Sequence, residues 1–133
     1  MTKVWERLYI GSLRDAEALA GANPNGVTTV ITLCDQKVTR RAQGTNYLRF
    51  PVDDDRPIDA GQFDAIIDAI GENIRWGTVL VHCIGGSSRS PIMAAAWMHV
   101  VGYRNIEDAL IEIGKRRSIE PSPSLLKSIK ELL

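Results

Sequence analysis

A cysteine and an arginine that could act together, Cys83 and Arg89, are separated by five residues near the middle of the chain. A loop of this length can wrap one tetrahedral oxyanion and present successive backbone N–H groups to its oxygens. Gly85 and Gly86 lie inside the loop and permit the backbone angles that such a turn requires. Arg89 would close the loop with a planar, two-pronged donor that matches phosphate oxygens. Because the Cys83 thiolate would then lie beneath the phosphorus, the spacing predicts nucleophilic phosphoryl transfer.

The segments on either side of this loop must position it. Thr78–Val81 is a short apolar run with the β-branched content of a buried strand. After Pro91, which suits the first turn of a helix, the apolar residues have helical spacing. A strand, a glycine-containing turn and a helix N-terminus form a general anion site, because unpaired N–H groups and the helix dipole converge there. We therefore expect a phosphate loop over residues 83–89. Its binding groups are Arg89 and the residues Ile84, Gly85, Gly86, Ser87 and Ser88, with both serines contributing mainly backbone amides.

The stretch His82–Ser90, HCIGGSSRS, resembles the H-C-x-x-G-x-x-R-S/T signature of the cysteine-dependent protein tyrosine phosphatases. It is most similar to the dual-specificity form, H-C-x-A-G-x-S-R-S, with Gly85 where alanine is usual. Leu8–Leu13 and Thr29–Leu33 also resemble segments of this family, and the resemblance covers nearly the whole chain. It implies a phosphomonoester hydrolase that acts through a cysteinyl-phosphate intermediate. No cofactor or metal is expected, since Arg89 and the loop amides supply the positive charge.

Such a reaction also needs an acid to protonate the leaving oxygen and later a base to activate water. Three carboxylates, Asp53, Asp54 and Asp55, follow the predicted strand Tyr47–Val52. They could form only a polar loop. The resemblance of Phe50–Asp55 to the family's I-P-I-x-D segment implies that Asp54 is the acid, with Asp53 and Asp55 as alternatives.

Three further side chains have both a structural and a functional interpretation. His82 is either the last buried residue of its strand or a donor that helps to hold the loop and the thiolate. Ser90 could cap the following helix, whereas the resemblance implies that its hydroxyl donates to the Cys83 sulfur. Cys34 directly follows the predicted strand Val27–Leu33, so both cysteines would emerge at the same edge of a parallel sheet. Cys34 is then a small buried apolar residue or a redox partner of Cys83.

The hydrophobic pattern alternates strands with helices along the chain. This order predicts an α/β fold whose central, mostly parallel sheet of four to five strands is flanked by helices on both faces. The phosphate loop would join a central strand to a helix. Other expected features are an edge strand at Val4–Ile10, helices at Ala16–Ala20 and Ser124–Leu133, and an amphipathic helix with Phe63, Ile66, Ile67, Ile70 and Ile74 inward.

Two more helices are expected after the phosphate loop. The first should direct Met93, Ala96, Trp97, Val100 and Val101 to the core and end at Gly102. The second should begin after the cap Asn105, place Ile106, Ala109, Leu110 and Ile113 inward, and carry the cations Lys115, Arg116 and Arg117 at its C-terminal end.

Length and composition restrict the remaining possibilities. A chain of 133 residues is expected to form a single catalytic domain over residues 1–133 and to be a monomer. Its 16 basic and 16 acidic residues give no charge signature of nucleic-acid or membrane binding. Two cysteines indicate a reducing compartment, and no signal peptide or membrane span is evident, so we expect a cytoplasmic protein.

The substrate class follows from the resemblance. Classical tyrosine-specific relatives are roughly twice as long and have a loop that deepens the pocket, so a shallow site for phosphotyrosine, and also for phosphoserine or phosphothreonine, is expected on phosphorylated proteins or peptides. Relatives that act on inositol lipids or RNA 5′-triphosphates often carry lysine in the phosphate loop, which is uncharged here before Arg89. Sulfur transfer, arsenate reduction and non-catalytic phosphopeptide binding remain as alternatives.

Overall fold

The strand that ends at the cysteine, β5 (Thr78–His82), occupies the centre of the sheet. The computed structural model describes residues 1–133 in full. The strand order is β1-β2-β5-β3-β4, with only β1 antiparallel to its neighbour. The other strands are β1 (Thr2–Trp5), β2 (Leu8–Gly11), β3 (Val27–Thr32) and β4 (Asn46–Arg49). The predicted α/β fold with a mostly parallel sheet is confirmed.

The first strand of the prediction is wrong in detail. In place of one edge strand at Val4–Ile10, the chain forms a hairpin in which β2 lies inside the sheet, parallel to β5. The turn between β1 and β2 consists of Glu6 and Arg7, and Arg7 adopts a φ of 58°. Neither residue is a glycine or an asparagine, so the sequence carries no turn signal at this point.

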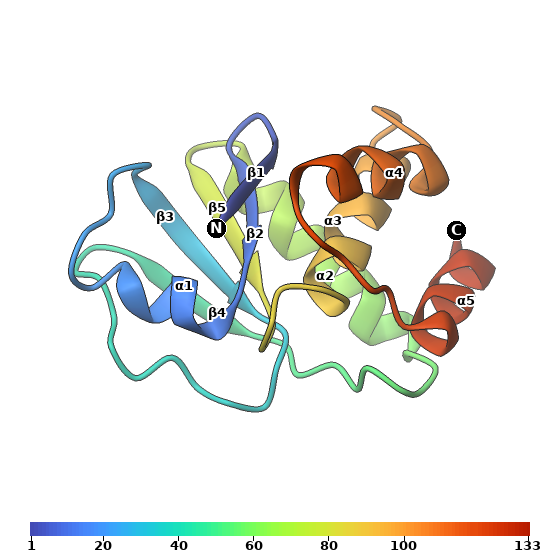
Figure 1. The fold of residues 1–133 in the computed structure, drawn as a ribbon, viewed down its shortest axis with the longest axis horizontal. Coiled ribbons are helices and arrows are strands. Elements are labelled where there is room, and N and C mark those ends of the chain that lie inside the picture. Colours follow the sequence, from blue (N-terminus) through green and yellow to red (C-terminus); the bar gives the residue numbers. More distant parts are fainter.

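Helices cover the two faces unequally (Figure 1). On one face lie α2 (Ala60–Ile74), α3 (Arg89–Val100), α4 (Ile106–Arg116) and α5 (Pro123–Leu132). The other face has only α1 (Leu13–Ala18) and the long connection from β3 to β4. Helix α1 begins three residues earlier than expected because Ser12 and Asp15 form a capping box.

The helix that follows the phosphate loop, α3, runs through the larger core. All nine residues from Ser90 to Met98 are buried, so this part of the helix has no single inward face. Val100 and Val101, expected in the core, are instead 52% and 41% exposed, because the last turn of α3 extends beyond the packed region. The five apolar residues predicted for α2 are buried, and Asn105 caps α4 as predicted. None of the helices is long and apolar enough to span a membrane.

Candidate active site

The register of the sheet carries Cys83 to the edge where the parallel strands end. His82, the last residue of β5, pairs with Thr32 of β3 and Gly11 of β2. The backbone N–H of Cys83 donates to the carbonyl oxygen of Gly11 at 3.3 Å. Cys83 is 2% exposed, and its Sγ lies 3.4 Å from the hydroxyl oxygen of buried Ser90. This contact agrees with the role that the resemblance implies for Ser90.

The phosphate loop is held from outside by a side chain that sequence interpretation missed. Arg117, the residue after α4, donates from Nε to the carbonyl oxygen of Gly86 at 2.9 Å and from Nη2 to that of Gly85 at 3.2 Å. Its Nη1 donates to the hydroxyl of Thr2, and Asp15 lies 3.8 Å from Nη2. In the sequence, Lys115, Arg116 and Arg117 indicate only a group of cations at a helix end. The hydrogen bonds to the loop carbonyls are what distinguish Arg117 from the other two.

Backbone donors hold two other carbonyl groups of the loop. The oxygen of Ile84 accepts from the N–H of Leu13 at 2.9 Å, and that of Ser87 accepts from Glu120 at 2.7 Å. By contrast, the backbone N–H groups of residues 84–88 donate to no acceptor of the chain. With the carbonyls held by surrounding elements, these five amides are available to an anion.

Gly86 shows why the loop requires a glycine at this position. Its φ is +71°, in the region that L side chains rarely adopt. A Cβ there would overlap Nη2 of Arg117 and come within 2.8 Å of the carbonyl group of Gly11. Gly85 has no such restriction, since a Cβ would meet nothing closer than 3.8 Å.

Of the three adjacent carboxylates, only Asp54 is bonded to the phosphate loop. Its Oδ1 accepts from the Ser88 hydroxyl at 2.6 Å, and the side chain is half-buried. Asp53 is exposed, accepts from the backbone N–H of Asp55 and pairs with Arg56 at 3.4 Å. Asp55 is also exposed. The geometry therefore favours Asp54 for a role at the loop.

Two neighbouring loop residues connect to the segment that carries Asp54. Arg89 donates from Nη1 to the carbonyl oxygen of buried Val52 at 3.1 Å. The Ser88 hydroxyl contacts Asp54 and also accepts from the backbone N–H of Ser122 at 2.8 Å. Ser88 was expected to contribute mainly its amide, so these side-chain bonds are a finding of the structure.

His82 is fully buried beside the cysteine. Its Nδ1 lies 3.1 Å from the carbonyl oxygen of Cys83, and its Nε2 lies 2.7 Å from the hydroxyl of Thr32. Because a carbonyl can only accept, Nδ1 carries the hydrogen and Nε2 accepts from Thr32. Burial lowers the pKa of His82, so the imidazole is neutral at pH 7. His82 thus orients the start of the loop.

Cys34 is fully buried and lies near the same edge of the sheet. Leu33 donates to the carbonyl oxygen of His82, so Leu33 continues the pairing and Cys34 lies one residue beyond. The Cys34 thiol donates to the backbone oxygen of Gln36 at 3.5 Å, and both cysteines are free. Burial raises the pKa of Cys34, while the nearby Arg89 guanidinium opposes this shift. A disulfide with Cys83 remains a prediction.

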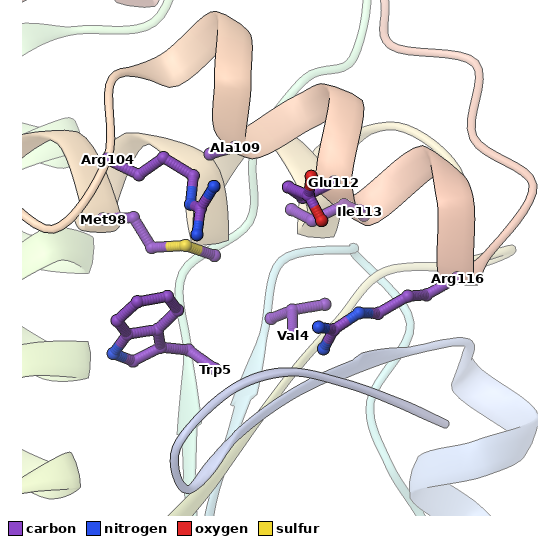
Figure 2. A pocket seen from close by; sticks show the side chains of 8 residues that line it. All are labelled: Val4, Trp5, Met98, Arg104, Ala109, Glu112, Ile113 and Arg116. Carbon is purple, nitrogen blue, oxygen red and sulfur yellow. The ribbon is translucent and has the colours of Figure 1, made fainter.

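A small cavity lies away from this site, between β1, α3 and α4 (Figure 2). It measures about 30 Å³, whereas pockets for organic ligands usually measure roughly 300–1,000 Å³. It is lined by Val4, Trp5, Met98, Arg104, Ala109, Glu112, Ile113 and Arg116. The cavity has room for water but is no alternative substrate site. No group of three or more His, Cys, Asp or Glu side chains that could hold a metal ion is present.

The fold places Cys83 at the start of a loop whose five backbone amides are unpaired, and comparison with known proteins identifies the family. Residues 8–132 match the family model of the dual specificity phosphatase catalytic domain. Human dual specificity protein phosphatase 22 is 30% identical over 134 residues, which cover 98% of this chain and 72% of that protein. The chain therefore belongs to the dual specificity phosphatase family, and the resemblance carried by His82–Ser90 is confirmed.

Solved structures agree with this assignment. Human DUSP28 superposes with a TM-score of 0.89 at 26% identity, covering 99% of this chain and 94% of that one. A mouse putative dual specificity phosphatase complexed with zinc tungstate has a TM-score of 0.88 at 26% identity, with coverages of 98% and 84%. The chain spans 64% of the length of the zebrafish relative, dual specificity protein phosphatase 22-A.

Proposed function

We propose that this chain hydrolyses phosphate monoesters of proteins or peptides, taking phosphotyrosine and also phosphoserine or phosphothreonine. The observation that carries the proposal is the set of five free amides at residues 84–88, adjoining the thiol of Cys83. The mouse relative is complexed with zinc tungstate, and tungstate is a tetrahedral oxyanion like phosphate, which supports a phosphate group as the ligand of this chain.

In the proposed mechanism, the Cys83 thiolate attacks phosphorus, forming the S–P bond as the bond to the leaving oxygen breaks. Arg89 and the loop amides stabilise the transferring phosphoryl group. Asp54 donates its proton to the leaving oxygen. The Asp54 carboxylate then accepts a proton from the attacking water as the P–S bond breaks. Ser90 donates to the departing sulfur, which suits its distance of 3.4 Å.

Sulfur transfer, arsenate reduction and simple phosphopeptide binding are the alternatives. The hydrogen bond from Ser88 to Asp54 favours hydrolysis, because neither sulfur transfer nor binding needs a carboxylate that moves protons. A persulfide assay identifies a sulfur-transfer enzyme directly. Binding alone predicts phosphopeptide affinity with no release of inorganic phosphate.

The first experiment measures phosphate release from phosphotyrosine, phosphothreonine, phosphoinositide and aryl phosphate substrates, with Cys83→Ser as the blank. We expect Cys83→Ser to abolish turnover while keeping the fold and anion binding. Arg89→Lys should be severely impaired, because a point charge does not replace the guanidinium fork. Turnover by Cys83→Ser above about one per cent of wild type would contradict the proposed nucleophile.

The second experiment separates the carboxylates. Asp54→Asn should slow hydrolysis of phosphotyrosine far more than that of p-nitrophenyl phosphate, because a good leaving group needs little protonation. Asp55→Asn is the matched control, since Asp55 is exposed and unconnected to the phosphate loop. The opposite pattern would assign the acid to Asp55.

We further propose a cytoplasmic monomer that binds neither nucleic acid nor membranes. The equal numbers of basic and acidic residues, 16 and 16, support this proposal. Light scattering after size-exclusion chromatography tests the oligomeric state, and fractionation of cells that make the protein tests its location.

A further inference from the structure

The hydroxyl of Ser88 occupies an unusual place for a residue that begins a helix. Ser88 is the N-cap of α3, yet its side chain makes no capping hydrogen bond. Instead, this side chain contacts two segments far away in the sequence, at Asp54 and Ser122. Ser88 is only 7% exposed, so its contact with Ser122 is buried, whereas the contact with half-buried Asp54 is partly buried.

The donors and acceptors of this contact can be assigned from elementary chemistry. A backbone N–H can only donate, so the Ser88 oxygen accepts from Ser122 at 2.8 Å. A hydroxyl has a single hydrogen, and the structure directs it to Oδ1 of Asp54 at 2.6 Å. If Asp54 carried its proton on Oδ1, the Ser88 hydrogen would have to leave this contact, and the Ser88 hydroxyl donates to no other acceptor of the chain. Leaving the hydrogen of a buried hydroxyl unpaired is unfavourable.

We propose that Ser88 is a positioning residue that selects which oxygen of Asp54 carries the catalytic proton. This inference rests on the proposed function, in which Asp54 is the general acid. Oδ1 is occupied by the Ser88 hydroxyl, whereas Oδ2 has no hydrogen-bond partner in the chain. The proton of the acid form is therefore on Oδ2. As it transfers, the Oδ2–H bond breaks and an O–H bond forms on the leaving group, and the Ser88 hydrogen bond stabilises the resulting carboxylate.

Arg89, the residue after Ser88, also contacts the segment that carries Asp54. Arg89 donates to the carbonyl oxygen of Val52, two residues before the acid, at 3.1 Å. Adjacent residues of the phosphate loop thus hold two points of the segment that carries Asp54. Arg89 fixes the backbone of this segment, whereas only Ser88 touches the carboxylate, so its hydroxyl is the group that can set the position of the proton.

The test compares the leaving-group dependence of kcat/KM, from p-nitrophenyl phosphate to phenyl phosphate and a phosphotyrosine peptide. We expect Ser88→Ala to lose about tenfold more activity with the poor leaving groups than with p-nitrophenyl phosphate, because only the former need the acid. Ser88→Thr keeps the hydroxyl and should restore the wild-type dependence. Ser88→Cys has a similar size but a weak donor, so it should behave like Ser88→Ala even if the alanine variant folds poorly.

Ser128→Ala is the matched control for loss of a buried hydroxyl. Ser128 is 8% exposed and accepts from the backbone N–H of Ile58 at 2.9 Å, beyond the segment that carries the acid. The Ser128→Ala variant should have a lower melting temperature but an unchanged leaving-group dependence of kcat/KM. In an Asp54→Asn background, Ser88→Ala should have no further leaving-group effect.

The inference is overturned if Ser88→Ala and Ser88→Cys slow all substrates by one common factor. It is also overturned if Ser88→Ala keeps its selective effect when Asp54 is already Asn, because the hydroxyl would then act elsewhere. Failure of the proposed function is distinguishable, since it appears as retained turnover in Cys83→Ser. If Cys83→Ser is inactive and Asp54→Asn is selective while Ser88→Ala is not, only the role of Ser88 is refuted.

Discussion

Replacing Arg117 should weaken anion binding although this side chain reaches the loop from behind. In Arg117→Lys, one ammonium replaces the fork that binds the carbonyl oxygens of Gly85 and Gly86. A hydrogen bond from a charged donor contributes about 1.5–3 kcal/mol, and lysine can keep one of the two. The Arg117 side chain is 19% exposed, so water partly compensates and the lower value applies. Losing about 1.5 kcal/mol of this support corresponds to a roughly tenfold weaker affinity of the loop for the anion.

The assay is competitive inhibition by inorganic phosphate or tungstate, measured together with kcat/KM for p-nitrophenyl phosphate. We expect the inhibition constant to rise about tenfold in Arg117→Lys, and further in Arg117→Met, which loses both bonds. Arg116→Lys is the matched control, because Arg116 donates to the backbone oxygen of Lys3 and does not touch the loop. Unchanged inhibition in Arg117→Met, or equal weakening in Arg116→Lys, would refute the reasoning.

The other predictions concern the loop, its histidine and the second cysteine. Gly86→Ala should abolish turnover of p-nitrophenyl phosphate, because it places a Cβ at a φ of +71° against a backbone carbonyl, whereas Gly85→Ala should remain active; equal activities would contradict this steric account. Because burial lowers the pKa of His82, the unfolded chain binds its proton more readily, so the free energy of unfolding should fall as pH drops below 6.5, the ordinary value. Urea unfolding at several pH values should show a smaller fall in His82→Asn, and an identical fall would exclude His82 as its source. Mild peroxide should inactivate the protein reversibly with a Cys34–Cys83 link detected by mass spectrometry, and Cys34→Ser should be harder to reactivate with thiols; absence of the linked peptide would leave Cys34 as a buried apolar residue.

The sequence by itself determined the chemical centre of this protein. Cys83, the loop glycines and Arg89 lie within nine consecutive residues, His82–Ser90, between a β-branched run and a helix. Because these groups belong to one short loop, their spacing along the chain largely determines their arrangement in space. The parallel pairing of β3 with β5 was also predictable, since both segments are short and rich in β-branched residues and a helix lies in the chain between them.

Only the tertiary structure decided how that centre is supported. Arg116 and Arg117 are adjacent and identical in type, and both contact β1, yet only Arg117 also holds the phosphate loop. Likewise, residue type does not distinguish Asp54 from the adjacent Asp53 and Asp55. The family resemblance points to Asp54, and the structure adds its hydrogen bond with Ser88. Residues 54, 88 and 122 meet across separations of 34 positions, and contacts of this kind leave no periodic pattern in the sequence. Local spacing therefore specifies the nucleophile, whereas the packing of distant segments specifies which neighbours orient it.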